Sequence, residues 1–409
     1  MPRVSIVIPT RNRAHLLKTA LQSALRQTYQ DLEILVSDNY CGNEETRKVY
    51  ESFQDPRLRY VRTDRLLAMP DSWDFALSHA KGDYVTFLTD DSYLLCYALE
   101  NALGALDKFN AELVVWDCCE YVSPDWVFPM PRNVLYVSIR RHQSNPYLVS
   151  SRDVLQQLYE LQPTRHMPKF LNSLCHQELI ARVLRVQKRM FLPPAPDYTA
   201  AVSLLVNTDK YVFLGQPLVI NGTTPWSIGA AQMINDGNAS KEFFKEFEET
   251  ESFRRLVDLD LTTATVCAAQ SLENVRRAFY SEQIPYQLNE RNMLCQSIET
   301  VAMYERNGAD TRAAWRVIDD YIARRDEDFK RAAAVQKRRS KLHSKLLTPV
   351  WRMVRRMPGA EYLERLTGRL RGEYLFHGTR YGFQNLEQCG QMAPQLIASF
   401  GDRASSLAS

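Results

Sequence analysis

The chain has 409 residues, of which 45% are hydrophobic and 24% are charged, and its formal net charge is +3. This length exceeds that of one small module, and typical domain sizes predict two or three domains. Both fractions lie near the averages of globular proteins, which excludes wholesale disorder and a fibrous repeat.

Strand and helix signals alternate with short connections over the first 120 residues. Compact apolar runs predict the strands, and apolar residues that recur at helical spacing predict the helices between them. This alternation is typical of a doubly wound α/β unit, in which helices cover both faces of a parallel sheet. The predicted strands span 4–9, 32–37, 58–61, 84–89 and 113–118, and the predicted helices span 14–27, 72–80 and 97–109.

The character of the sequence changes after residue 123. Residues 124–196 are rich in proline, and beyond about residue 239 helical patterns dominate. We expect an α/β domain at 1–238 with a division near residue 120, a helical domain at 239–335, and basic amphipathic helices with a C-terminal tail at 336–409. In the middle segment, strands are predicted at 134–139 and 211–221, and helices at 151–161 and 170–189.

Three polar loops follow predicted strands of the first half, at 9–13, 37–39 and 89–92. In open α/β sheets, ligands bind beyond the carboxyl ends of the parallel strands, where such loops converge. A dinucleotide-binding fold would place G-x-G-x-x-G after the first strand, but the first loop contains no glycine. The loop sequence therefore argues against a dehydrogenase.

The third loop carries two adjacent carboxylates, Asp90 and Asp91. Like charges at the mouth of a buried strand repel each other, and a divalent cation would offset the repulsion. Hard oxygen ligands suit Mg²⁺ or Mn²⁺, which take their remaining ligands from water and substrate phosphates. The alternative is that the pair caps a helix that begins near Tyr93, because acidic residues favour helix N-termini. The pair by itself does not decide between the two.

Four segments in a fixed order carry a resemblance to a known family. They read S-I-V-I-P-T-R-N-R at 5–13, L-x-x-A-L-x-S-A-L-x-Q-T-Y at 17–29, D-L-E-I-L-V-S-D-N at 31–39, and A-K-G-D-Y-V-T-F-L-T-D-D-S at 80–92. Together they resemble the family 2 glycosyltransferases with the GT-A fold, over roughly residues 3–230. The resemblance implies a Rossmann-like, mostly parallel sheet flanked by helices, followed here by a mainly α-helical C-terminal region. It also implies that residues 1–120 bind a nucleotide sugar and that residues 121–238 face the acceptor.

The resemblance assigns substrate-binding roles to four residues of the first two loops. Pro9, Thr10 and Arg13 match the first nucleotide-binding loop of the family. Asp38 matches the acid that hydrogen-bonds the base, usually uracil. A uridine or thymidine diphosphate donor is therefore implied.

The acidic pair matches the family's D-x-D-type motif, in which the first acid faces the ribose and the last one ligates the metal. Asp91 is thus the predicted ligand of Mn²⁺ or Mg²⁺, and Asp90 is predicted to bind the donor. Many members carry a further acid upstream, where this chain has Thr89. Because this upstream acid is absent, the division of roles between Asp90 and Asp91 departs from the common pattern of the family.

Glycosyl transfer also needs a base that removes the proton of the acceptor hydroxyl. Asp197 lies in P-P-A-P-D-Y at the start of an apolar helix, where the family usually places this base. Direct displacement would invert the anomeric carbon. Two alternatives stay open: Asp197 is a good helix N-cap, and Glu178 is a reserve candidate for the base.

Other conspicuous residues carry weaker signals. Ser227 and Gly229 lie where a flexible loop of the family often closes over the diphosphate. Trp73 is more often a core residue than part of a donor pocket, and His166 and His176 lack the partners of a metal site.

Positive charge is concentrated near the C-terminus, where residues 330–372 hold 13 Lys and Arg and only two Glu. Apolar residues such as Leu342 and Leu346 are interleaved at helical spacing, and Pro349 is expected at the first position of a helix. A cationic amphipathic helix within 337–371 predicts contact with an anionic membrane surface. The alternative is packing against the acidic residues of 240–330. No nucleic-acid-binding motif is present, and we expect no nucleic-acid partner.

The N-terminus lacks the apolar region and cleavage site of a secretory signal, and no apolar stretch approaches the ~20 residues that span a bilayer. The eight cysteines include no C-x-x-C pair, so neither a zinc cluster nor a disulfide framework is predicted. We expect a cytoplasmic location, with peripheral attachment at the inner face of the membrane if the basic helices bind lipid.

The leading hypothesis is a metal-dependent, inverting glycosyltransferase of the hexosyltransferase type. It would move a sugar from a UDP- or dTDP-linked donor to a hydroxyl of a glycan or lipid-linked acceptor in polysaccharide biosynthesis. One alternative is a non-catalytic GT-A-fold scaffold that binds a membrane or partner through its C-terminal half. Another is a sugar-nucleotide nucleotidyltransferase, although the glycine-rich, lysine-bearing loop of that class is absent.

Overall fold

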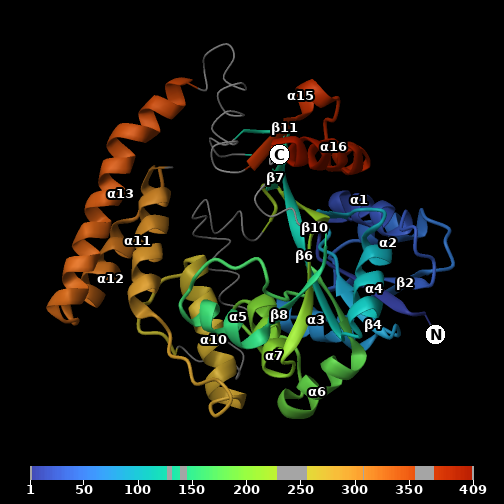
Figure 1. Cartoon of the computed structure of the whole chain (residues 1–409), viewed down its shortest axis with the longest axis horizontal. Coiled ribbons are helices and arrows are strands. Elements are labelled where there is room, and N and C mark those ends of the chain that lie inside the picture. Colours follow the sequence, from blue (N-terminus) through green and yellow to red (C-terminus); the bar gives the residue numbers. More distant parts are fainter. Residues whose placement is uncertain are drawn as a thin grey trace.

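The computed structural model describes residues 2–126, 131–138, 145–227, 256–306, 308–354 and 373–407. In this part of the chain a single large sheet runs through the centre, helices cover its faces, and a group of helices lies to one side (Figure 1). The sheet order is β11-β7-β6-β9-β4-β1-β2-β3, and β10 pairs with β5, β6 and β8.

The N-terminal part of the sheet is parallel, as the sequence predicts. Strand β1 pairs in parallel with β2 and β4, and β2 pairs in parallel with β3. Every residue of β1 and β2 is buried because helices cover both faces, which explains why these strands are mainly apolar. The elements are β1 (Val4–Thr10), α1 (Ala14–Leu25), β2 (Leu32–Asp38), α2 (Glu45–Glu51), β3 (Leu58–Arg62), α3 (Met69–Ser78), β4 (Tyr84–Phe87), β5 (Ser92–Leu94) and α4 (Ala98–Phe109).

Beyond β4 the sheet contains antiparallel pairings. Strand β9 pairs antiparallel with both β4 and β6, whereas β10 runs parallel to β6. The helix predicted over 170–189 is wrong in its first part, because residues 173–176 form β9 and the helix begins only at Gln177. A short apolar run has no period of its own, and pairing on both sides decided its structure. The elements are β6 (Leu113–Val122), β7 (Val134–Ser138), β8 (Tyr147–Ser150), α5 (Ser151–Tyr159), β9 (Ser173–His176), α6 (Gln177–Gln187), α7 (Pro196–Val206) and β10 (Lys210–Thr223).

The region after residue 255 is mainly helical, as predicted. Helix α10 joins the main core through Leu272 and Val275, and α11, α12 and α13 share a second core that includes Ile298 and Tyr321. Helix α13 runs through position 349, so the expectation that Pro349 starts a helix is wrong. None of the helices in the described ranges is both long and apolar enough to cross a membrane. The elements are α10 (Ala264–Phe279), α11 (Glu290–Arg306), α12 (Arg312–Ala323) and α13 (Glu327–Val354).

The C-terminal segment returns to the sheet. Strand β11 (Glu373–His377) pairs antiparallel with β7, which the sequence pattern did not predict. Helix α16 (Leu386–Leu407) follows the short α15 (Gly378–Tyr381) and lies against α1 and β5 (Figure 1). Its buried residues share a core with β5 and β10, in which Cys389 packs with Tyr93 and Ile220. All eight cysteines lie in the described ranges and are free thiols.

The predicted domain borders near 120, 238 and 335 stay predictions. Helix α13 spans the last of them. Residues 240–255 of the acidic segment, the alternative partner of the basic helix, and residues 355–371 of the predicted basic helix lie outside the described residues.

Candidate active site

The first and third polar loops meet at the carboxyl edge of the parallel strands. Thr10 is the last residue of β1 and pairs with Asp38, the last residue of β2. The backbone amide of Leu88 donates to the carbonyl of Val7 at 2.9 Å, which carries the next residues, 89–92, to the same edge. The strand register therefore brings together residues that are up to 80 positions apart.

Asp90 is buried and held by the loop after β1. The Thr10 hydroxyl donates to its Oδ2 at 2.7 Å, and Nη1 of Arg13 donates to its Oδ1 at 3.1 Å. Burial raises the pKa of Asp90 to about 6, and the neighbouring Asp91 adds to the rise, while Arg13 opposes it. The structure thus joins three predicted substrate-binding residues, and both oxygens of Asp90 are engaged within the protein.

Asp91 faces a cavity of about 720 Å³. Its Oδ2 accepts a hydrogen bond from the Ser227 hydroxyl at 2.6 Å, which links the acidic loop to the segment after β10. The main chain of Gly222 approaches so closely that an added Cβ would lie 2.1 Å from the Asp91 carbonyl oxygen. The helix-cap alternative for the acidic pair is wrong, because the residues that follow form β5 and α4 begins only at Ala98.

Asp38 is fully buried beside this cluster. Its Oδ1 accepts from the backbone amide of Cys41 at 2.8 Å, and its Oδ2 accepts from the Tyr60 hydroxyl at 2.6 Å. Burial and the adjacent Asp38 carboxylate raise the pKa of Tyr60. In this arrangement Asp38 fixes the turn after β2, and its predicted contact with a base stays a prediction. Pro9 pairs with Ser37 in the sheet, one step before Thr10.

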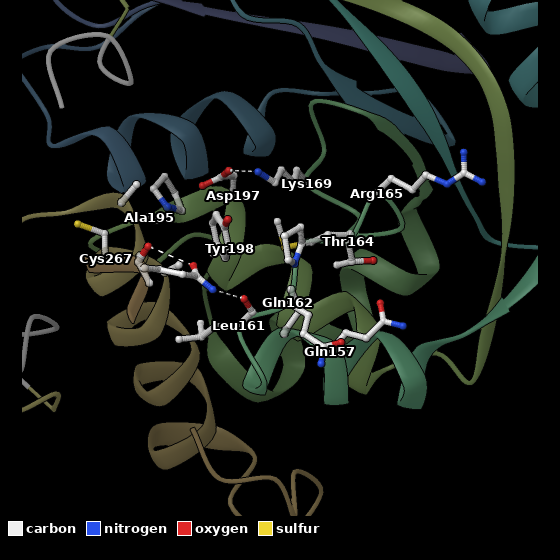
Figure 2. A pocket seen from close by; sticks show the side chains of 18 of the residues that line it. Gln157, Leu161, Gln162, Thr164, Arg165, Lys169, Ala195, Asp197, Tyr198 and Cys267 are labelled. Atoms are coloured by element: carbon white, nitrogen blue, oxygen red, sulfur yellow. Dashed lines mark hydrogen bonds and ion pairs between the residues drawn. The ribbon is translucent and has the colours of Figure 1, made fainter. Parts of the chain in front are cut away.

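Asp197 lines the same cavity as Asp91, although the two residues are distant in sequence. It lies in the first turn of α7. The N-cap of α7 is Ala195, with no side-chain capping bond, so Asp197 is not the N-cap. Its carboxylate forms an ion pair with the ammonium of Lys169 (Figure 2), and the two groups lie 3.3 Å apart. The same ammonium lies 4.7 Å from the centre of the Tyr198 ring. Burial disfavours the ammonium, but the charge of Asp197, the neighbouring Tyr198 and the hydrogen bond to Asp197 together outweigh this effect and raise the pKa of Lys169.

The reserve candidate Glu178 lies at the other end of the sheet. The residue two positions earlier, His176, pairs with Tyr84, the first residue of β4, whereas the acidic pair follows the end of β4. Glu178 is exposed there, in the first turn of α6. This position removes it as a base for chemistry at Asp91.

Four charged residues of the cavity wall were missed in the sequence. Besides Lys169 these are Asp117 and Glu120 in β6 and Arg165. Nη1 of Arg165 lies 2.9 Å from the Asp117 carboxylate. The Arg165 guanidinium also lies 4.8 Å from the centre of the Phe213 ring. Asp117 carries a usable signal, because it interrupts an apolar run within a predicted strand. The two cations lie in an irregular segment whose partners are distant in sequence.

The weaker sequence signals have mixed outcomes. Trp73 is a core residue, 7% exposed, with its ring 5.5 Å from that of Phe87. His176 caps α6 by accepting from the amide of Glu178, and His166 packs edge-on against Phe213, so both histidines are structural. Gly229 lies outside the described residues.

The acidic loop suits a divalent cation that takes few ligands from the protein. In the described ranges no group of three or more His, Cys, Asp and Glu side chains is placed to hold a metal. Mg²⁺ is commonly bound by one or two carboxylates together with substrate phosphates and water. Asp91 meets this requirement, since its carboxylate borders a cavity that could admit a diphosphate.

The parallel strands, the covering helices and the acidic loop at the carboxyl edge define a GT-A-type α/β architecture. Residues 5–156 match the model of the family described as glycosyl transferase family 2. The match confirms, over residues 5–156, the resemblance seen in the sequence motifs.

Two of the curated relatives each match about a quarter of the chain. Over 116 residues the chain is 37% identical to the GalNAc(5)-diNAcBac-PP-undecaprenol beta-1,3-glucosyltransferase of Campylobacter jejuni, which covers 28% of this chain and 37% of the relative. Over 107 residues it is 30% identical to the UDP-Glc:alpha-D-GlcNAc-diphosphoundecaprenol beta-1,3-glucosyltransferase of Escherichia coli. This match covers 26% of this chain and 42% of the relative. The chain therefore spans less than half the length of either relative.

Solved structures with a similar course cover more of the chain at low identity. Residues 1–349 of S. aureus TarS, in complex with UDP-GlcNAc, match with a TM-score of 0.44 and 12% identity, over 83% of this chain and 91% of that one. The mannosyltransferase PcManGT of Pyrobaculum calidifontis, in complex with GDP-Man and Mn²⁺, matches with a TM-score of 0.39 and 16% identity. This match covers 85% of this chain and 88% of that one.

Proposed function

We propose that this protein is a metal-dependent, inverting glycosyltransferase that transfers a sugar from a UDP- or dTDP-linked donor to a hydroxyl of a glycan acceptor. The observation that carries the proposal is the shared cavity, which has Asp91 on one wall and Asp197 on another. One carboxylate is thus available to the donor's diphosphate and a second one to the acceptor, as a single displacement requires.

The residues divide the work between donor and acceptor. Thr10 and Arg13 hold Asp90 at the donor side, and Asp91 would hold a Mn²⁺ or Mg²⁺ ion. A bound cation neutralises the charge that develops on the diphosphate leaving group, which is worth several kcal/mol.

In this proposal Asp197 accepts the proton of the acceptor hydroxyl. As the acceptor oxygen attacks the anomeric carbon, the bond to the diphosphate breaks and the hydroxyl proton passes to the Asp197 carboxylate. Attack opposite the leaving group inverts the anomeric carbon. The ion pair with Lys169 orients this carboxylate at 3.3 Å before the acceptor binds.

We further propose a lipid-linked acceptor and attachment to an anionic membrane surface. The names of both relatives describe acceptors on an undecaprenol diphosphate. Helix α13 packs against its neighbours in its first half, where Ala333 is buried and Lys337 pairs with Asp319. Further along, Leu342 is 59% exposed, at the start of the basic segment 337–371. An exposed apolar residue among cations is what an interfacial helix presents to lipid.

A donor screen tests the proposed activity. The full chain is incubated with Mn²⁺, a glycan mixture, and UDP-, dTDP- or GDP-sugars in turn, and released nucleoside diphosphate is measured. We expect release from a UDP- or dTDP-sugar, stimulated by the glycans and lost in Asp197→Ala. A wild-type chain that releases no diphosphate from any donor would instead favour a scaffold.

A further inference from the structure

A second cavity, of about 870 Å³, adjoins the proposed acceptor side (Figure 2). Its walls come from the segment 157–169, the start of α7, and helices α10 and α11. Lys169 and Asp197 line both cavities and therefore lie where the two meet. Among the described residues that line the second cavity, none comes from the acidic loop or from the loops after β1 and β2. The volume is in the range of about 300–1,000 Å³ that suits small-molecule sites.

The lining of this cavity mixes apolar with polar side chains and carries little net charge. Its two cations, Arg165 and Lys169, each form an ion pair with a carboxylate. Amide and hydroxyl side chains can both donate and accept hydrogen bonds, as the hydroxyls of a neutral sugar require. These side chains are Gln157, Gln162, Thr164, Thr265 and Gln296.

Hydrogen bonds tie the walls together before any ligand binds. On α11, Nε2 of Gln296 donates to the carbonyl of Leu161 at 2.6 Å, and its Oε1 accepts from the Thr265 hydroxyl at 3.4 Å. One turn earlier, Nδ2 of Asn292 donates to the carbonyl of Glu160 at 2.8 Å. A cavity held open in this way spares a ligand part of the ordering cost of binding.

We infer that this cavity is a second acceptor subsite, which holds the sugar unit next to the one that receives the transferred sugar. The acceptor is then an uncharged oligosaccharide of at least two units near its reacting end, and the helical region selects it together with the α/β domain. The inference rests on the proposed function, because it places the reacting unit at Asp197.

The test fills the second cavity and leaves the first one open. Gln157→Trp on α5 adds an indole to the cavity wall, and Gln162→Trp does so from an exposed position of the same wall. Gln156→Trp is the matched control, because Gln156 is exposed on the same helix and lines neither cavity. The probes are the p-nitrophenyl glycoside of the accepted terminal sugar and the corresponding disaccharide and trisaccharide.

For wild type we expect a kcat/KM for the disaccharide and trisaccharide roughly tenfold above that for the monosaccharide, as one or two added hydrogen bonds would give. Both cavity variants should reduce the oligosaccharide values to the monosaccharide value, and Gln156→Trp should keep the wild-type ratio. Donor hydrolysis without acceptor should be equal in all four proteins, which also shows that they are folded.

Equal kcat/KM for all three probes in wild type would overturn the inference, and so would an unchanged ratio in the cavity variants. Either result leaves the proposed function standing, because transfer itself still occurs. Absence of transfer to every probe would instead remove the proposed function and the inference with it.

Discussion

Gly222→Ala is expected to displace the acidic loop. The added Cβ would lie 2.1 Å from the carbonyl oxygen of Asp91, whereas real Cβ contacts are essentially never under 3.0 Å. The main-chain segments around Gly222 and Asp91 must therefore separate by about 0.9 Å. Leu386 stands 3.4 Å from the same Cβ and limits retreat on that side. Because a misplacement of about 1 Å can cost a factor of roughly 10² in rate, we expect kcat to fall about 100-fold.

The matched control is Gly104→Ala, in α4. No atom lies within 4 Å of a Cβ added there, so this variant should be stabilised by about 0.5–1 kcal/mol and keep full activity. Steady-state release of nucleoside diphosphate and urea unfolding measure the two effects. A Gly222→Ala enzyme with wild-type kcat would refute the argument that the Asp91 main chain must stay in place.

Three further predictions concern the surroundings of the site. Lys169→Met removes the ammonium that orients Asp197, so kcat should fall about 10–100-fold with the donor KM unchanged; a change in donor KM alone would contradict this. Burial raises the pKa of Asp74 to about 6, above its unfolded value, so the folded state loses stability as the pH rises through this range. In urea unfolding, the free energy of unfolding of Asp74→Asn relative to that of wild type should therefore rise by about 1–3 kcal/mol between pH 4 and pH 7. Parallel pH dependences of the two unfolding free energies would disprove this. Gly390→Leu would bring a Cβ within 2.5 Å of the Tyr93 ring and should cost about 1–3 kcal/mol; an unchanged urea midpoint would show that α16 does not need this contact.

The parallel part of the sheet could be predicted because its signals are local. Strands β1 and β2 are buried along their whole length and β4 along most of it, so each is mainly apolar, and the polar loops mark their carboxyl ends. The meeting of Thr10 with Asp90 then follows from strand order alone.

The missed elements depend on distant partners. Strand β9 exists because β4 and β6 flank it, and β11 exists because β7 offers a free edge some 235 residues earlier. Neither run has a period that separates a strand from a helix. The ion pair of Asp117 with Arg165 could not be predicted either, because the two residues are distant in sequence and come within 2.9 Å only in the folded chain.

The sequence motif located Asp197 but did not predict its contacts. Its place in the sequence was found from the resemblance, but the ion pair with Lys169 and the cavity shared with Asp91 come only from the packing of α7 against the rest of the fold. Its role as the base stays a prediction until the variant is measured.

The metal dependence of nucleotide binding at Asp91 tests the central claim most directly. Titration calorimetry would compare UDP binding to the wild-type chain and to Asp91→Ala, each with Mn²⁺ and with EDTA. We predict that wild type binds UDP tightly only with Mn²⁺, and that Asp91→Ala binds it weakly and equally under both conditions. Equal affinity of wild type for UDP with and without Mn²⁺ would contradict a metal–diphosphate site at this loop.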